Sequence, residues 1–171
     1  GEIPLTISST PAEPGIQSFT AGAYDSNGNA DTQAGDHPYS ASTVIFANTI
    51  RSPAGEIAPA GEFRNLSVEL PPGFLGNPIA VPQCPERIEE IACPFSTMVG
   101  IAMPLINFGA GLSGAGVGKS AVFNTEGPLG DPAKFRFNVR ESVPLSVTGA
   151  LRSDSDYGGT AELINTPQIQ P

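Results

Sequence analysis

Glycine and proline interrupt this chain every few residues, and that punctuation limits what the chain can fold into. The 171 residues include 20 glycines and 18 prolines, which stand between short runs of alternating apolar and polar residues. Neither residue suits the interior of a helix or of a central strand. Short alternating runs joined by such turns are typical of an all-β domain.

We therefore expect a β-sandwich, jelly-roll or immunoglobulin-like, of about eight or nine short strands. The main runs cover residues 16–24, 42–50, 63–70, 97–108, 121–124, 134–140, 143–151 and 161–165. Within these runs one parity is apolar, and it predicts a core of Leu66, Val68, Leu70, Val99, Ile101, Phe123, Phe135, Phe137, Val139, Leu145 and Val147.

The distribution of proline predicts three parts of the chain. Residues 1–15 are broken by prolines and form an expected extended N-terminal segment, residues 16–166 form a single β-sandwich domain, and residues 167–171 form an extended tail. The terminal segments, roughly residues 1–16 and 164–171, are the predicted contacts to neighbouring subunits, since an ordered extended segment needs a sheet edge to pair with.

The two cysteines predict one disulfide. Cys84 and Cys93 enclose eight residues, a spacing too long for a CxxC redox motif and without a second pair for a zinc site. A bond between them would contribute roughly 2–3 kcal/mol on the chain-entropy model. The segment Pro85–Ala92 inside this loop predicts the one short helical turn of the chain, because acidic residues crowd its start.

Charge, hydropathy and the cysteine pair limit which partners and which cellular location we expect. The formal net charge is −9, which disfavours binding to nucleic acid. No apolar run is long enough to span a membrane. Structural disulfides are rare in the cytosol, so the cysteine pair predicts an extracellular or cell-surface location.

One turn contains a weak candidate for a metal site. Asp25, Asn27, Asn29 and Asp31 alternate along residues 25–31, a spacing that can surround Ca²⁺ with oxygens. The alternative is a solvated hairpin turn, because Asn-Gly and Asp are the residues that such turns require. The turn is the preferred interpretation, and no cofactor is predicted.

Other motifs point away from an enzyme. Residues 109–114 fit GxGxxG and residues 113–120 come within one substitution of a P-loop, but no helical period follows them. His37 is the single histidine and reads as a loop residue, with no motif for a triad around it. Paired carboxylates at 89–90 and 154–156 lack the aromatic platforms of a glycosidase.

Several turn and packing motifs occur in a characteristic order: TQAGDHPY, LPPGFLGNP, CPFSTMVG, GDPAKFRF and LRSDSDYG. Together they resemble a recurring unit in large secreted proteins of actinobacteria, over about residues 15–166. The resemblance implies a secreted, modular and structural role, with no established activity, and one module of a longer polypeptide.

The sequence therefore predicts a non-enzymatic extracellular structural module, a subunit of a surface assembly, filament or adhesive fibre that associates with itself or with tandem modules. The alternative is a glycan-binding surface module. An aromatic-lined face would favour glycan binding, and polymeric native material would favour the structural role.

Overall fold

The structure, a computed structural model, describes residues 12–51, 55, 57–61, 63–85, 92–106, 116–139, 143–153 and 156–166. Their regular elements are β-strands apart from one 3-10 turn, which confirms the predicted all-β class and fits a β-sandwich type of fold. Contacts between Cα atoms divide the chain into two compact units. The first comprises the described residues up to Gly61, and the second comprises the described residues from Phe63 onward.

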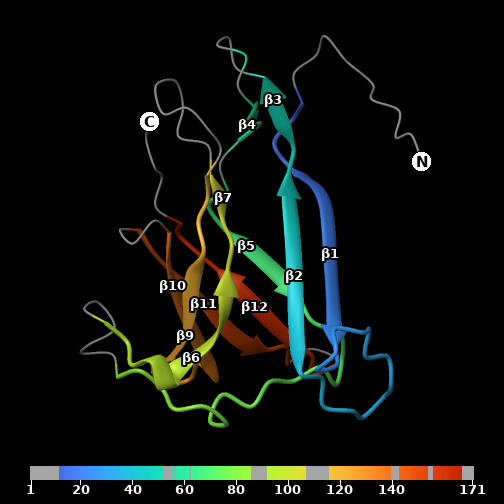
Figure 1. The fold of residues 1–171 in the computed structure, drawn as a ribbon, viewed down its shortest axis with the longest axis vertical. Coiled ribbons are helices and arrows are strands. Elements are labelled where there is room, and N and C mark those ends of the chain that lie inside the picture. The colour runs from blue at the N-terminus through green and yellow to red at the C-terminus, as the bar shows by residue number, and fades with distance from the viewer. Residues whose placement is uncertain are drawn as a thin grey trace. The chain divides into compact units, whose positions relative to one another are not determined.

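The first unit contains two antiparallel strand pairs. These are β1 (Ile16–Tyr24) with β2 (Ser40–Ala47), and β3 (Thr49–Arg51) with β4 (Ile57–Pro59). The β1–β2 pair is a long ribbon, drawn in blue and cyan in Figure 1. Its register sets Phe19 opposite Ile45 and Ala21 opposite Thr43. β1 covers the predicted run 16–24, whereas the predicted run 42–50 is divided between β2 and β3.

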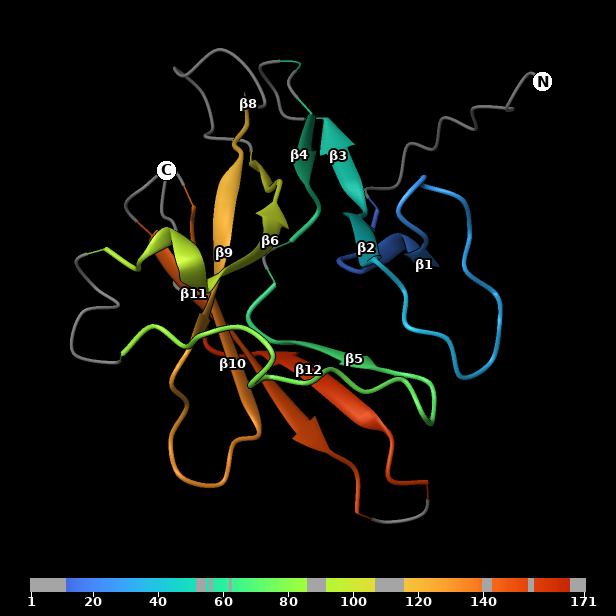
Figure 2. The ribbon, with the colours of Figure 1, turned by 60° about the horizontal axis from the view of Figure 1, so that its bottom comes forward.

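The second unit is organised around a six-stranded antiparallel sheet in the order β5-β12-β11-β10-β9-β6 (Figure 2). Its strands are β5 (Leu66–Glu69), β6 (Met98–Ala102), β9 (Ser120–Thr125), β10 (Ala133–Val139), β11 (Val143–Leu151) and β12 (Gly159–Leu163). A two-residue pair, β7 (Leu105–Ile106) with β8 (Gly116–Val117), belongs to the same unit.

Strand register gives this sheet one apolar face. Phe135 lies opposite Val147, and Val147 lies opposite Leu163, so large apolar residues line up across three strands. This face carries Leu66, Val68, Phe135, Phe137, Val139, Leu145, Val147 and Leu163. Val139 is buried and the others are half-buried. The alternation read from the sequence along β5, β10 and β11 therefore describes the sheet correctly.

Of the other predicted core residues, Leu70 is half-buried directly after β5, and three more lie off this face. Val99 is 42% exposed and lies in the bulge of β6 between Met98 and Gly100. Ile101 is 61% exposed and lies opposite Ala121, on the face of the sheet that carries Phe123. Phe123 lies opposite Arg136 and shares the polar face of the sheet. A bulge shifts the parity of the strand that carries it, so alternation alone could not assign Val99 and Ile101. The face of Phe123 follows from the register of β9 with β10, which sequence alternation does not give.

The described residues hold twelve strands, more than the predicted eight or nine. β4 and β8 fall outside the predicted runs, and the runs 42–50 and 97–108 are each divided into two strands. The 3-10 turn η2 (Phe95–Thr97) follows the second cysteine. Residues 86–91 of the predicted helical turn lie outside the described part. The same holds for residues 1–11 and 167–171, so the predicted N-terminal segment and tail stay predictions.

Candidate functional site

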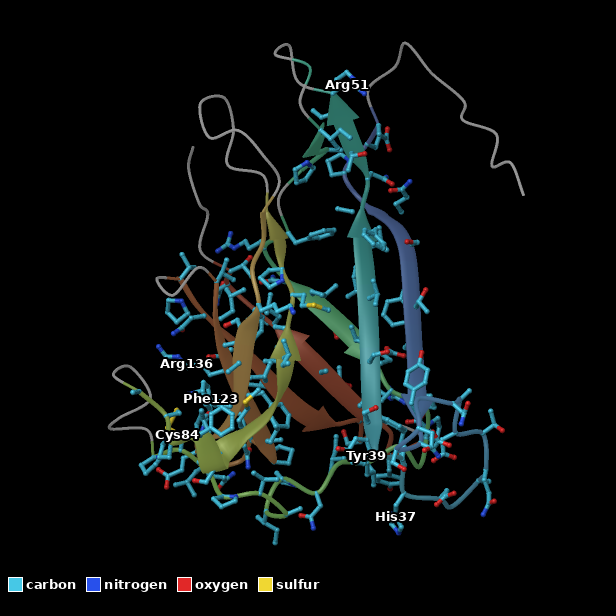
Figure 3. All side chains as sticks on the ribbon, in the orientation of Figure 1. His37, Tyr39, Arg51, Cys84, Phe123 and Arg136 are labelled. Carbon is cyan, nitrogen blue, oxygen red and sulfur yellow. A yellow bond between two sulfur atoms is a disulfide. The ribbon has the colours of Figure 1, made fainter. Side chains whose placement is uncertain are left out.

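The cysteine pair forms a disulfide, as predicted, with a Cα–Cα distance of 5.5 Å between Cys84 and Cys93. Cys84, labelled in Figure 3, is fully buried and forms an isolated parallel bridge with Thr125 at the end of β9. Its N–H donates to the carbonyl of Asn124 at 2.8 Å, and its carbonyl accepts from the N–H of Glu126 at 3.1 Å. Two backbone hydrogen bonds therefore join Cys84 to the sheet.

Asn124 holds the segment that precedes Cys84. Its side chain is 1% exposed, and the Nδ2 group donates to the carbonyls of Pro78 and Val81 at 2.7 and 2.9 Å. Carbonyls that are removed from water need a donor. This proline-rich segment has few N–H groups of its own, and the Asn124 amide supplies the donor. Sequence reasoning missed this residue. The sequence did contain a clue, because Asn124 is a polar residue that lies on the same face of its strand as the apolar Val122.

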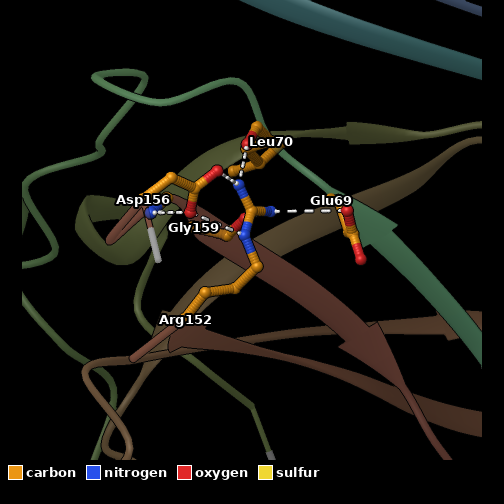
Figure 4. A network of polar contacts seen from close by, with 6 residues as sticks. Glu69, Leu70, Arg152, Asp156 and Gly159 are labelled. Carbon is orange, nitrogen blue, oxygen red and sulfur yellow. Dashed lines mark hydrogen bonds and ion pairs between the residues drawn. The ribbon is translucent and has the colours of Figure 1, made fainter. Parts of the chain in front are cut away.

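A second polar junction centres on Arg152, whose side chain is 17% exposed (Figure 4). Nε and Nη2 donate to the two carboxylate oxygens of Asp156 at 3.0 and 2.7 Å. The same guanidinium donates to the carbonyls of Leu70 and Gly159, each at 3.0 Å. It therefore fastens the end of β5 to the connection between β11 and β12.

The electrostatics of this junction follow from its hydrogen bonds. The side-chain hydrogen bond from Arg152 and the N–H of Gly158 lower the pKa of Asp156 from 3.8 to about 2. A bidentate guanidinium–carboxylate pair has this effect because it stabilises the ionised acid. The N–H groups of Arg152 therefore bind backbone and side-chain oxygens of the protein itself. Its partner Asp156 is one of the two carboxylates of the pair at 154–156.

The predicted calcium residues lie in the turn that follows β1. Asp25 Oδ1 accepts from the N–H groups of Asn27 and Asn29 at 2.8 and 2.9 Å, and Oδ2 accepts from Asn29 Nδ2 at 3.1 Å. These bonds, led by the side-chain bond from Asn29, lower the pKa of Asp25. Gly28 has φ +83°, which the Asn-Gly turn requires. The hydrogen bonding of Asp25 is that of the hairpin turn, the interpretation preferred from sequence.

Other candidates sit in loops or strands. The backbone N–H of His37 donates to Asp36 Oδ1 at 2.7 Å, and its side chain projects from an exposed loop (Figure 3). Ser120, the last residue of the P-loop-like motif, begins strand β9 and not the helix that a phosphate site needs. Residues 107–115 and the Glu89–Glu90 pair lie outside the described part.

The β1–β2 ribbon presents backbone groups at its edges. The N–H of Asp25 donates to the carbonyl of Asn29 and the N–H of Asp31 donates to the carbonyl of Ala23, both at 2.9 Å, on the side of β1 away from β2. Alternate residues of a strand direct N–H and C=O to opposite sides, so the even-numbered residues of β1 bond to β2.

The register then fixes the other edge. Ala21 and Ala23 lie opposite Thr43 and Ala41, so Ala41, Thr43 and Ile45 direct their N–H and C=O away from β1. These groups make no hydrogen bond to another described residue. Among the described residues, the outer edge of β2 is therefore an unpaired strand edge.

Within the described residues, no group of three or more His, Cys, Asp or Glu could hold a metal ion. The same part of the chain contains no helix long and apolar enough to cross a membrane. The class that these features define is a disulfide-bonded all-β protein. Comparison with known proteins adds no relative, since neither family models, curated proteins nor solved structures match the chain.

Proposed function

We propose that this chain is a non-enzymatic structural module of an extracellular assembly, whose subunits associate through strand edges. The disulfide supports an oxidising location, because cytosolic proteins seldom keep structural disulfides. The ordered motifs that resemble units of secreted actinobacterial proteins support the same location. Arg152 and Asn124 support a structural role, since their donors tie distant backbone segments together.

The observation that carries the proposal is the two-stranded state of the β1–β2 ribbon. Phe19 on one face and Val44 and Phe46 on the other are 49%, 44% and 51% exposed. A two-stranded hairpin is marginally stable in water, and additional strands stabilise it. Pairing with another subunit would supply those strands and bury part of this apolar surface.

Sedimentation velocity on native protein across a range of concentrations, together with electron micrographs, tests the proposal. We expect species larger than the monomer, and we expect non-reducing mass spectrometry to find no free thiol. A chain that stays monomeric at high concentration would contradict the assembly role. The glycan-binding alternative would then lead, and a panel of immobilised polysaccharides would test it.

Deletion of residues 1–14 tests the predicted contribution of the N-terminal segment separately. If this segment forms a contact, the truncated chain should assemble less than the intact chain. Equal assembly would remove that contact while leaving strand-edge association in place. The comparison needs only the same sedimentation experiment.

A further inference from the structure

The outer edge of β2 lacks the features that prevent a strand edge from pairing with a strand of another molecule. Neither β1 nor β2 contains a charged residue or a proline. Natural edge strands are protected by charges, prolines, bulges or short length. β2 has none of these over its eight residues, Ser40–Ala47.

The edge strands of the six-stranded sheet are protected. β5 has only four residues, ends at Glu69 and is followed by Pro71. β6 carries a bulge between Met98 and Gly100. This contrast shows that β2 differs from both of these edge strands.

The outer edge of β1 is also obstructed. An isolated antiparallel bridge joins Tyr24 to Ala30, so the segment after the turn already pairs with one end of this edge. A register irregularity between Ile16 and Ser18 lies at the other end. Of the two edges of the ribbon, only that of β2 is regular along the strand.

We propose that the outer edge of β2 pairs antiparallel with β2 of a second copy of this chain, with Thr43 opposite Thr43 at the two-fold axis. This inference rests on the proposed function and specifies its contact. The pairing would join two ribbons into a four-stranded sheet through roughly six backbone hydrogen bonds. The contact closes on itself, so it links chains in pairs, and growth beyond pairs requires another contact.

The sequence of β2 fits a second copy because it is complementary to itself in this register. Ala41 would face Ile45, Ser42 would face Val44, and Ser40 would face Phe46. Each pair sets a small residue against a larger apolar one, and Thr–Thr is a favourable cross-strand pair. The chain has a net charge of −9, so an uncharged strip is where two copies can approach with least repulsion.

Proline substitution tests the edge without removing a β1–β2 hydrogen bond. In Thr43→Pro the lost N–H is directed outward, and edge strands accept proline at such positions. We expect sedimentation equilibrium to show a dimer for the native chain and a dissociation constant at least about tenfold weaker for the variant. The matched control is Ala21→Pro at the same level of the ribbon, because its lost N–H faces the outer edge of β1. It should associate like the native chain.

Cysteine cross-linking gives a second measurement that does not depend on tolerance of proline. The two native cysteines are bonded to each other, so an introduced cysteine is the one free thiol. Opposed residues of a hydrogen-bonded pair have Cα atoms about 5.5 Å apart, within reach of a disulfide. Thr43→Cys should therefore form a covalent dimer under mild oxidation, and Ala21→Cys should not.

The outcomes separate this inference from the proposed function. If the native chain associates and Thr43→Pro associates equally well, the β2 contact is wrong and assembly through another surface stands. If circular dichroism shows that Thr43→Pro is unfolded, the absence of a Thr43→Cys dimer overturns the contact. A native chain that is monomeric overturns both proposals.

Discussion

Replacing Asn124 with alanine should strongly destabilise the second unit. The side chain is 1% exposed and satisfies the carbonyls of Pro78 and Val81. These bonds are partly buried, and a carbonyl left there without a donor costs about 1–3 kcal/mol. We therefore expect Asn124→Ala to lower the free energy of unfolding by about 2–5 kcal/mol, equivalent to roughly 5–15 °C in Tm for a chain of this length.

Urea denaturation followed by circular dichroism measures this loss, and Asn138→Ala is the matched control. Asn138 lies on the neighbouring strand β10 with an exposed side chain, so its removal should cost less than about 0.5 kcal/mol. The comparison holds the chemical change constant and varies only burial and hydrogen bonding. It therefore measures the combined effect of burial and of the hydrogen bonds to the two carbonyls.

The disulfide supplies a second readout of the same junction. Cys84 is fully buried and follows directly on the segment that Asn124 holds. Loss of the Asn124 amide should expose this segment more often, so dithiothreitol should reduce the Cys84–Cys93 bond faster in Asn124→Ala than in Asn138→Ala. Equal stabilities and equal reduction rates for the two variants would refute the reasoning.

Two further predictions concern the same unit. Because Arg152 lowers the pKa of Asp156 from 3.8 to about 2, the ionised pair stabilises the fold above pH 4 and this contribution is lost as the pH falls toward 2; denaturation curves should show that Asp156→Asn reduces the pH dependence in this window. Phe137→Ala on the half-buried apolar face should cost about 2–4 kcal/mol by urea denaturation, whereas Ile101→Ala on the exposed edge should cost less than about 0.5 kcal/mol. Similar losses for Phe137 and Ile101 would show that the faces are assigned wrongly.

Local sequence determined the strands and the apolar face of β5, β10 and β11. β11 begins and ends where its alternating run does, and Phe135 and Phe137 lie on the predicted apolar face. The turn after β1 also follows from sequence, because Asp25, Asn27 and Gly28 meet its requirements within a few residues. These features depend on neighbours along the chain, and so they can be read from it.

Cysteine spacing likewise predicted a bond that the structure contains. The pair closes a short loop, and the chain has no other cysteine with which either could bond. The face of Ile101 could not be read in the same way. β6 reads as an apolar strand in sequence, yet Ile101 is 61% exposed, because the register after the bulge places it opposite Ala121 on the face of Phe123.

Only the tertiary structure shows which polar side chains bond to backbone groups far away in the sequence. Arg152 reaches the carbonyl of Leu70, 82 residues away, and Asn124 reaches that of Pro78, 46 residues away. It also decided that β2 has an open edge, since its one strand partner among the described residues is β1. A backbone carbonyl or N–H is chemically the same at every position, so only the arrangement of distant strands determines which of these groups are paired within the described part of the chain.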